Sequence, residues 1–432
     1  MKNEFNDIIN QQSMIGRSLG MYLISTEDEQ YDGRIITFNG KKHVFFSSCS
    51  YLGLDVHPAL KKASIEAVEK FGVNLSSSRA TVSLGLYEEL ENLLGQIFNK
   101  PVYVSPSTTL GHLASIPTLM EKDDAIIMDQ QVHNSVKTAV QLLKAEGIYT
   151  EIIKHNRMDM LETRIQILRQ NHKRVWYMAD SVYSMFGDSA PFSKISELLN
   201  TYEEFHFYVD DAHGMSWAGK NGNGYALSKM DWHPKMLMAT SLGKGFGSGG
   251  GALIFNDENQ RNLIRSCSGP SIFSGPLQPA VLGAAIASAK LHLTDEIDNL
   301  QDSLFEKMFY FIETAKRYNL PLVSHELTPI FYLATGKKEI SYKISSFLLK
   351  EGFFGMTTVF PAVPMKNSGM RVTVTNHLTL DDIDGLLSRF AEILPLALKE
   401  EGSSMDEIYE AFNMFKPQQK ENIMPIERRK IA

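Results

Sequence analysis

The fold of this chain is most constrained by an alternation of short apolar runs with helical segments between residues 101 and 255. The segments between the runs place apolar residues at helical spacing, as in 136–146 and 158–170. Strands that alternate with helices form βαβ units, which assemble into a largely parallel sheet. The sequence therefore predicts an α/β domain whose ligands bind outside the carboxyl ends of the strands. The runs are PVYVS, DAIIMD, RVWYMAD, FHFYVDD, MLMATS and GALIF.

Further segments flank this region on both sides. The stretch RIITFNGKKHVFF begins at Arg34 and holds an Asn-Gly pair between apolar runs, which predicts a tight hairpin. A long helical stretch from Val281 to about Tyr318 leads into strands near LTPIFYLATG, GFFGMTTVF and MRVTVT, which predict a smaller α/β unit. We therefore expect four parts: an N-terminal arm and hairpin at 1–45, a large domain at 46–293, a small C-terminal domain at 294–400 and an extension at 401–432.

Charge and cysteine content narrow the class of protein. The net charge of -7 argues against a general nucleic-acid binder, which needs a basic surface to neutralise phosphates. Cys49 and Cys267 lack CxxC spacing, which excludes a disulfide framework or a zinc cluster and favours a reducing compartment. The N-terminus lacks a signal architecture, and no apolar run is long enough to cross a bilayer. We expect a cytoplasmic protein with no metal, no nucleic-acid partner and no stable membrane insertion.

A single lysine, Lys244, lies among glycines in ATSLGKGFGSGGGALIF. A Walker A loop requires Ser or Thr after Gly-Lys, and Gly245 stands there instead. Gly245, Gly247 and Gly250 match a dinucleotide fingerprint in letters, but a strand follows where a helix must begin. Two interpretations remain open: a plain surface turn, or a lysine that forms a Schiff base with pyridoxal phosphate, with Ser241 close to the phosphate.

Candidate partners for such a cofactor follow neighbouring strands. Asp210 ends the run FHFYVD, and an unpaired buried carboxylate is costly unless it meets a cation such as a pyridinium. The alternative is that the Asp pair caps the next helix. His213 follows three residues later and could contact the phenolic oxygen. His133 stands at a helix start, where it could stack on the ring or act as a helix cap or core residue.

Phosphate donors are predicted in the segment SPSTTLGHLASI. With Ser105 as the N-cap and Pro106 in the first turn, the backbone N–H groups of Ser107, Thr108 and Thr109 would be available to an anion. An ordinary capped helix is the alternative interpretation.

Taken together, these segments resemble the α-oxoamine synthase family of fold-type I pyridoxal phosphate enzymes, from about Arg34 to about Leu394. The similar motifs are YLGL followed by HP, DSVYSMFGDSAPF, VDDAHGMSWAGKNGNG and TSLGKGFGSGGG. The resemblance implies a large domain with a mostly parallel seven-stranded sheet and a smaller C-terminal α/β domain. It also implies a decarboxylative Claisen condensation of an amino acid with an acyl thioester of CoA or a carrier protein, giving an α-amino ketone.

The resemblance further implies roles for individual residues in an obligate homodimer with shared active sites. Lys244 would form the Schiff base and act as the base, Asp210 would pair with the pyridine nitrogen, and His133 would stack on the ring. The remaining implied contacts are His213 and Ser184 near the phenolic oxygen, Ser107, Thr108, Thr109 and Ser241 at the phosphate, Ser274 and Gly275 at the phosphate from the second subunit, and Arg371 and Cys49 at the amino-acid carboxylate.

Several departures from the family lie near the substrate. Cys49 replaces an asparagine, Tyr87 replaces a histidine, and hydroxyl residues at Thr108 and Thr109 replace a glycine and an aromatic residue. Aminotransfer or aldol cleavage on the same scaffold therefore stays open, as does a non-catalytic nucleotide-binding module. An acyl tunnel lined by phenylalanines is also open, although simple core packing is favoured for them; these are Phe353, Phe354 and Phe360.

Overall fold

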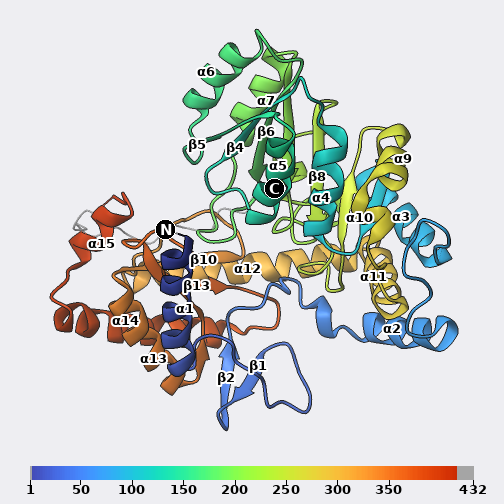
Figure 1. Cartoon of the computed structure of the whole chain (residues 1–432). Coiled ribbons are helices and arrows are strands. Elements are labelled where there is room, and N and C mark those ends of the chain that lie inside the picture. The colour runs from blue at the N-terminus through green and yellow to red at the C-terminus, as the bar shows by residue number, and fades with distance from the viewer. Residues whose placement is uncertain (1, 416–432) are drawn as a thin grey trace, which may run out of the picture.

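The computed structural model describes residues 2–415, and its centre is a seven-stranded sheet in the order β3-β9-β8-β7-β6-β4-β5 (Figure 1). All neighbours pair in parallel except β9, which is antiparallel to both β3 and β8. This confirms the predicted α/β fold. The strands are β3 (Val102–Ser105), β4 (Ala125–Asp129), β5 (Tyr149–Ile153), β6 (Val175–Asp180), β7 (Phe205–Asp210), β8 (Met236–Ser241) and β9 (Gly251–Ile254).

Six of these strands coincide with the predicted apolar runs, and β5 is the one that the pattern missed. The central strands β4, β6 and β8 are buried along their whole length, which explains their continuous apolar character. By contrast, β5 lies at the sheet edge and leaves most of its residues at least partly exposed. An edge strand of this kind carries polar residues such as Glu151, so its apolar signal is weak.

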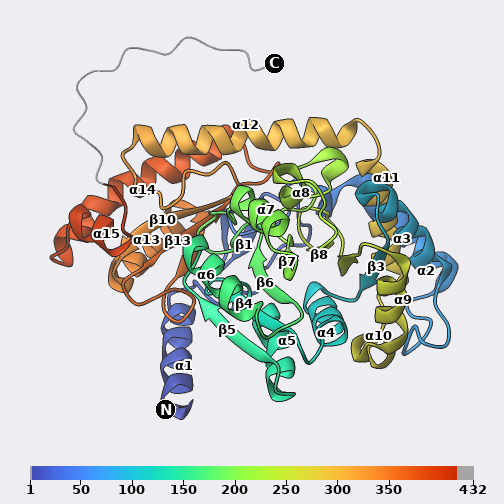
Figure 2. The ribbon, with the colours of Figure 1, turned by 90° about the horizontal axis from the view of Figure 1, so that it is seen from above.

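Helices cover both faces of the sheet (Figures 1 and 2). At one end α2 and α11 pack so closely that a Cβ at Gly283 would lie 2.4 Å from the carbonyl oxygen of Ala63, so the contact requires glycine. The helices around the sheet are α2 (Pro58–Phe71), α3 (Gly85–Phe98), α4 (Thr108–Leu119), α5 (Asn134–Ala145), α6 (Met158–Leu168), α7 (Phe192–Thr201), α8 (Tyr225–Lys229), α9 (Glu258–Cys267), α10 (Gly269–Phe273) and α11 (Pro279–His292).

The C-terminal part has its own three-stranded antiparallel sheet, ordered β10-β13-β12. Figure 2 shows α12 running along one side of the molecule and reaching this part from α11. The predicted helical stretch from Val281 is thus two helices, because residues 293–295 are not helical and separate α11 from α12. The elements are α12 (Glu296–Arg317), β10 (Ile330–Gly336), α13 (Lys338–Glu351), β12 (Met356–Thr358), β13 (Ser368–Thr373), α14 (Leu380–Glu400) and α15 (Met405–Ala411).

The N-terminal segment contains the predicted hairpin, β1 (Ile35–Phe38) and β2 (Lys41–Phe45), with positive φ at both Asn39 and Gly40. The hairpin is extended by β11 (Phe353–Phe354), which pairs in parallel with β2. The rings of Phe353 and Phe354 pack against hairpin-side aromatic residues, as their core interpretation predicts. A helix that the sequence did not indicate, α1 (Lys2–Ser18), precedes them and extends away from the body in Figure 2.

The proposed boundaries at 45, 293 and 400 stay a prediction, and residues 416–432 of the expected extension lie outside the described residues. Within the described part, no helix has the length and apolar character needed to cross a membrane. Over the same residues, no group of three or more His, Cys, Asp or Glu side chains is placed to hold a metal ion.

Candidate active site

A cavity of about 340 Å³ opens at the carboxyl ends of β6, β7 and β8, where the parallel topology places ligands. The register brings Asp180 of β6 beside Asp210 of β7, and Asp210 beside Ala239 of β8. Most of the predicted cofactor residues meet here, contributed by four separate loops and strand ends. Those that line the cavity are Ser107, Thr108, Thr109, His133, Asp210, His213, Ser241 and Lys244.

Lys244 lies in the loop between β8 and β9, with its Nζ 2.8 Å from His213 Nε2. The other ring nitrogen of His213 lies 2.6 Å from the hydroxyl of Tyr51. Burial lowers the pKa of Lys244, and burial together with the Lys244 and Arg371 charges holds the pKa of His213 well below its usual value. The site therefore favours a neutral imidazole at His213 beside a lysine whose pKa is lowered by burial.

The loop reaches this position because of Gly247, whose φ of 76° is left-handed. A Cβ at this glycine would lie 2.4 Å from Leu54 Cβ, so no larger residue fits against the N-terminal segment. Gly247 thus allows close packing of the loop against the N-terminal segment, a role that the sequence did not indicate.

Asp210 is buried and ionised. Burial alone would raise its pKa, but the charge and hydrogen bond of His112, with further help from Lys244 and His133, hold the pKa at about 2. Its Oδ2 lies 2.9 Å from His112 Nε2, and its Oδ1 accepts from the backbone N–H of Ala212 at 3.0 Å. The neighbouring Asp180 behaves in the opposite way, because burial and the Asp210 charge raise its pKa well above the usual value.

His112 is a site residue that sequence reasoning missed. It is fully buried, and its Nδ1 lies 2.8 Å from the hydroxyl of Tyr208, which in turn lies 2.9 Å from Ser115 Oγ. Tyr208 and Asp210 are two residues apart on one strand and therefore share a face, but His112 is 98 positions from Asp210, so no local pattern connects it to them. This chain of hydrogen bonds, from Ser115 through Tyr208 and His112 to Asp210, orients the carboxylate toward the cavity.

The helix-capping alternative applies to Asp211 and not to Asp210. Successive strand residues point to opposite faces, so Asp211 turns away and accepts from the backbone N–H of Ala226 at the start of α8. Burial raises the pKa of Asp211 to about 7. The Asp pair therefore divides between a group that faces the cavity and a group that supports the fold.

The predicted anion-binding helix start is present, but its N-cap is Ser107 and not Ser105. Ser107 Oγ accepts from the backbone N–H of Leu110 at 3.1 Å, whereas Ser105 ends β3 and donates to the Ser107 carbonyl. The strand runs on to Ser105 because it pairs with Gly251 of β9, which shifts the helix by two residues. The first N–H groups of α4, at Thr108 and Thr109, point along the helix axis into the cavity.

His133 is the N-cap of α5 and also lines the cavity. Its Nδ1 accepts from the backbone N–H of Ser135 at 3.3 Å, while the backbone N–H of His133 donates to Asp180 Oδ1 at 2.9 Å. Burial lowers the pKa of His133, which favours the neutral ring. One residue can thus cap α5 and also present its imidazole to a cofactor ring in the cavity.

Arg371 comes from β13 in the C-terminal part and lies close enough to Lys244 to lower its pKa. Its Nε donates to the carbonyl of Ser184 at 2.5 Å, and its Nη2 lies 3.9 Å from Cys49 Sγ. Ser184 itself lines a second, larger cavity and not the one around Lys244. Arg371 and Cys49, predicted at the amino-acid carboxylate, thus lie close together, but neither is among the residues that line the cavity around Lys244. Ser184 lies outside that cavity too, away from its predicted place near the phenolic oxygen.

Two other predicted contacts lie away from the cavity of this chain. Ser274 is half-buried and Gly275 is exposed, and neither lines the cavity around Lys244. Tyr87, which replaces the histidine of the family, accepts from the backbone N–H of Leu277 at 2.6 Å and lies 3.6 Å below the Arg79 guanidinium. Tyr87 thus anchors the segment that carries Ser274 through its hydrogen bond to Leu277.

Comparisons with known proteins agree with this geometry. A family described as aminotransferase class I and II matches residues 42–390. The chain is 30% identical over 393 residues to the 8-amino-7-oxononanoate synthase of Thermoanaerobacter pseudethanolicus. This match covers 90% of this chain and 96% of the relative. The enzyme of the same name from Alkaliphilus metalliredigens is 32% identical over 364 residues, or 83% and 89% of the two chains. The chain belongs to the α-oxoamine synthase family.

Solved structures show the same fold. A serine palmitoyltransferase from S. paucimobilis, with a bound PLP-myriocin aldimine, matches with a TM-score of 0.82 at 22% identity and covers 93% of this chain and 98% of that one. The 8-amino-7-oxononanoate synthase of Francisella tularensis matches with a TM-score of 0.69 at 21% identity, covering 82% and 98%. This α-oxoamine synthase is thus a pyridoxal phosphate-dependent transferase of fold type I, which confirms the predicted class and cofactor and removes the non-catalytic alternative.

The donor set of the cavity fits that cofactor. A phosphate is matched by the N–H groups of α4 with the hydroxyl of Ser241, and a protonated ring nitrogen by the ionised Asp210. The Thr108 hydroxyl donates to the carbonyl of Thr240 at 3.2 Å. An aldehyde carbon is matched by the amine of Lys244, whose pKa is lowered by burial. One cavity of the α-oxoamine synthase thus brings together an amine, a carboxylate and phosphate donors that fit pyridoxal phosphate, while Ser184, Ser274 and Gly275 lie outside it.

Proposed function

We propose that this enzyme condenses an amino acid with an acyl thioester and releases CO₂ to give an α-amino ketone. The observation that carries the proposal is the convergence of three groups: the amine of Lys244, the ionised carboxylate of Asp210 and the guanidinium of Arg371. The curated relatives named 8-amino-7-oxononanoate synthase support the same class of reaction.

The cofactor would be held by Lys244 through its Nζ, with Asp210 at the pyridine nitrogen and His133 against the ring. Its phosphate would lie at the start of α4 beside Ser241, and His213 would lie near its phenolic oxygen. Pyridoxal phosphate, when bound, withdraws electrons from the Cα of the amino acid and so makes its proton removable.

The side chains then divide the work of proton transfer and binding. The planar guanidinium of Arg371 is suited to hold the amino-acid carboxylate through paired hydrogen bonds. Lys244 takes the Cα proton on Nζ, and burial, which lowers the pKa of this amine, favours the deprotonated form that a base requires. Asp210 stays ionised throughout, because its pKa of about 2 lies far below working pH.

Bond changes in the proposed reaction balance without a redox partner. A bond forms between Cα and the thioester carbonyl carbon, the C–S bond breaks, and the thiolate leaves and takes up a proton. The bond from Cα to the carboxylate then breaks to release CO₂, and the Cα regains a proton from Lys244 Nζ. The products are a thiol, CO₂ and an α-amino ketone.

We also propose a homodimer in which Ser274 and Gly275 of the second subunit complete the phosphate site. Phe273, immediately before them, is 86% exposed in the single chain, as expected for a segment that packs against another copy. Light scattering of the holoenzyme tests this: a monomeric, fully active enzyme would contradict it.

The test of the reaction is a set of assays of holoenzyme with single amino acids, each with and without an acyl-CoA. We expect thiol and CO₂ in equal amounts only when one amino acid and a thioester are both present, with a matching change in the visible absorbance of the bound cofactor. A keto acid formed from the amino acid with an amino acceptor, or cleavage to an aldehyde, would show the aminotransferase or aldolase alternative instead.

A further inference from the structure

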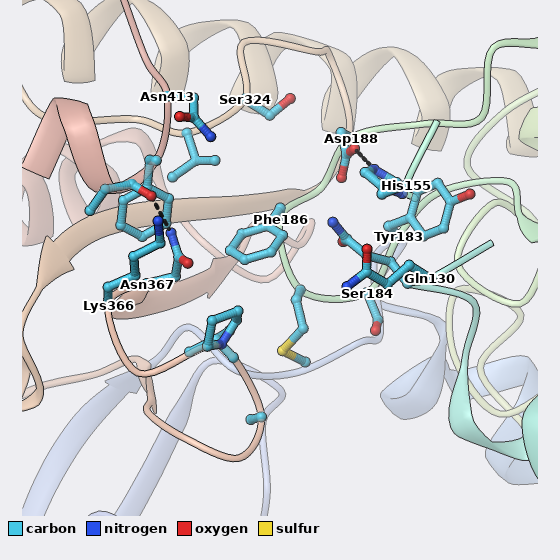
Figure 3. A pocket seen from close by; sticks show the side chains of 18 of the residues that line it. Gln130, His155, Tyr183, Ser184, Phe186, Asp188, Ser324, Lys366, Asn367 and Asn413 are labelled. Carbon is cyan, nitrogen blue, oxygen red and sulfur yellow. Dashed lines mark hydrogen bonds and ion pairs between the residues drawn. The ribbon is translucent and has the colours of Figure 1, made fainter. Parts of the chain in front are cut away.

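A histidine held between two carboxylates lies on the wall of the larger cavity and takes no part in the contacts described above (Figure 3). His155 follows β5, with its Nδ1 2.8 Å from Asp129 Oδ1 and its Nε2 2.6 Å from Asp188 Oδ2. Asp129 is fully buried at the end of β4, the strand between β5 and β6. Because both ring nitrogens face an acceptor, the doubly protonated imidazolium is the form that satisfies both contacts.

The groups around this histidine favour the same charged form. Tyr177 of β6 donates its hydroxyl to Asp129 Oδ2 at 3.2 Å, and the ring of Tyr183 meets His155 edge-on at a centroid distance of 4.4 Å. Lys137 of α5 is the nearby cation, and the Asp129 charge acts on it too. The two carboxylates nevertheless outweigh burial and raise the pKa of His155 to about 9. His155 is therefore a cation at neutral pH.

Asp188 depends on this cation. In the described part of the chain its Oδ1 is buried without a hydrogen-bond partner, so the contact of Oδ2 with His155 holds the side chain. Asp188 belongs to a tight turn of residues 182–189, whose ends pair as an antiparallel bridge. Within the turn, the N–H of Tyr183 donates to the carbonyl of Asp188 at 2.8 Å. A displacement of the Asp188 side chain therefore acts on the turn as a whole.

The 182–189 turn is also held by neutral and singly charged contacts. Asn156 Nδ2 donates to the carbonyl of Ser189 at 3.0 Å from the side of the central sheet. From the C-terminal part, Glu326 accepts from Ser189 Oγ at 2.5 Å, and Thr328 Oγ1 donates to the carbonyl of Gly187 at 2.8 Å. The contact with the histidine differs from these because it pairs two opposite charges and depends on a proton of the imidazole.

The turn reaches the reaction through the carbonyl of Ser184. This carbonyl accepts from Arg371 Nε at 2.5 Å, and Figure 3 shows Ser184 near His155 and Asp188. A planar guanidinium binds a carboxylate through paired N–H groups, so the orientation of its plane decides how well it binds. By engaging Nε, the Ser184 carbonyl fixes that plane.

We propose that His155, as an imidazolium, is a positioning residue for amino-acid binding: through Asp188 it fixes the 182–189 turn, whose Ser184 carbonyl orients the guanidinium of Arg371. The inference rests on the proposed function, because it takes the amino-acid carboxylate as the ligand of Arg371. His155 does not line the cofactor cavity and acts through the turn.

The experiment measures amino-acid binding to the holoenzyme without a thioester, from the visible absorbance of the bound cofactor. The protein amino acids are tested singly, and the one that binds wild type most tightly is the probe. His155→Gln and Asp188→Asn should each raise its Kd about tenfold. The double variant should raise it no further than the larger single effect, because both substitutions remove one contact.

Arg174→Gln is the matched control. It breaks the paired hydrogen bonds to the buried Asp124 at the opposite edge of the same sheet, where β4 and β6 begin. This variant should lose stability and keep the Kd of wild type, which separates positioning of Arg371 from a general loss of stability.

The pH profile tests the role of the charge. The ratio of Kd in His155→Gln to Kd in wild type cancels the titration of the amino acid and the cofactor, which the two proteins share. The ratio should be about ten at pH 7 and should fall towards one as pH rises through about 9, where His155 loses its proton.

Three results would overturn the proposal: a Kd in His155→Gln within about twofold of wild type at pH 7, an equal rise in Arg174→Gln, or a ratio that is the same at every pH. Asp188→Asn provides the same test if His155→Gln fails to fold. A raised Kd with no thiol or CO₂ release from any thioester would support the positioning while contradicting the condensation.

A wild type that binds no amino acid would contradict the carboxylate role of Arg371, and the positioning is then tested directly. A crystal structure of the His155→Gln holoenzyme should show the Ser184 carbonyl displaced from Arg371 Nε. A hydrogen bond kept as in wild type would overturn the proposal.

Discussion

The two cavities of this enzyme lie at the same edge of one sheet, yet they are built in different ways. The cofactor cavity is formed by residues within a few positions of a strand end, such as Asp210 and Lys244, and charge sets its chemistry. The large cavity joins strand-end loops to residues from β10 onward, including Phe412 after the last described helix, and its far wall is aromatic. The groups proposed for the reaction thus lie in short local motifs, whereas the large cavity is formed by contacts between distant segments.

Lys244→Ala gives the largest expected effect and tests the cofactor side. Turnover should fall by at least about 10⁴-fold, since one group supplies both the cofactor attachment and the base. The melting temperature should change little, because the substitution removes one side-chain hydrogen bond, the one to His213. Lys235→Ala, a lysine at the start of β8 that bonds the Tyr202 carbonyl, is the control. Activity of Lys244→Ala within tenfold of wild type would contradict its assignment.

His155→Gln tests the wall of the large cavity through stability. Burial alone would lower the pKa of His155, but its bonds to Asp129 and Asp188 raise it to about 9. Because the folded pKa exceeds the unfolded value of 6.5, this stabilisation is fully present below pH 6.5 and is lost as pH rises through about 9. The variant should be less stable by up to about 3 kcal/mol at pH 6.

Urea unfolding at pH 6 and pH 9.5 measures the effect. The stability difference between wild type and His155→Gln should be large at the lower pH and small at the higher one. An equal difference at both values would show that packing, and not the ion pairs, accounts for the loss.

His112→Asn tests how far the cofactor cavity depends on a residue outside the strand-end motifs. Without the imidazole the pKa of Asp210 should rise from about 2, because its main stabilising charge and hydrogen bond are lost. The native stabilisation from Asp210 is present above pH 3.8 and is lost as pH falls through about 2. The acid limit of cofactor retention should therefore move to higher pH, with a drop in kcat of about tenfold.

The visible absorbance of the bound cofactor, followed as pH is lowered, reports this shift directly. The control is His206→Asn, which changes a histidine on β7, the strand of Asp210, that does not line the cavity. Identical acid limits in wild type and His112→Asn would remove His112 from the site.

Cys49→Asn gives the smallest expected effect. The thiol lies 3.9 Å from Arg371 Nη2 and offers a weak contact, whereas an amide could bond the bound carboxylate. One neutral hydrogen bond contributes about 0.5–1.5 kcal/mol, so KM for the amino acid should fall about two- to tenfold with kcat nearly unchanged. Steady-state kinetics with the exposed Cys267→Ser as control would measure it, and an unchanged KM would place Cys49 away from the carboxylate.

Local patterns accounted for much of the fold. The six apolar runs became strands, the Asn-Gly pair became the hairpin turn, and the strand ends brought Asp210, His213 and Lys244 to one cavity. Where the pattern was weak the prediction failed: α1 is rich in polar residues, and β5 lies at an exposed edge. Strand pairing to Gly251 also moved the N-cap of α4 from Ser105 to Ser107.

By itself, the sequence determined the order of strands and helices and the chemistry at the strand ends, because both depend on residues that are near neighbours along the chain. Tertiary structure alone decided that His112 supports Asp210 and that Arg371 of the C-terminal sheet lies beside Cys49 and close to Lys244. These contacts join residues about 100 to 320 positions apart, and no local periodicity encodes which distant side chains a packed core brings together.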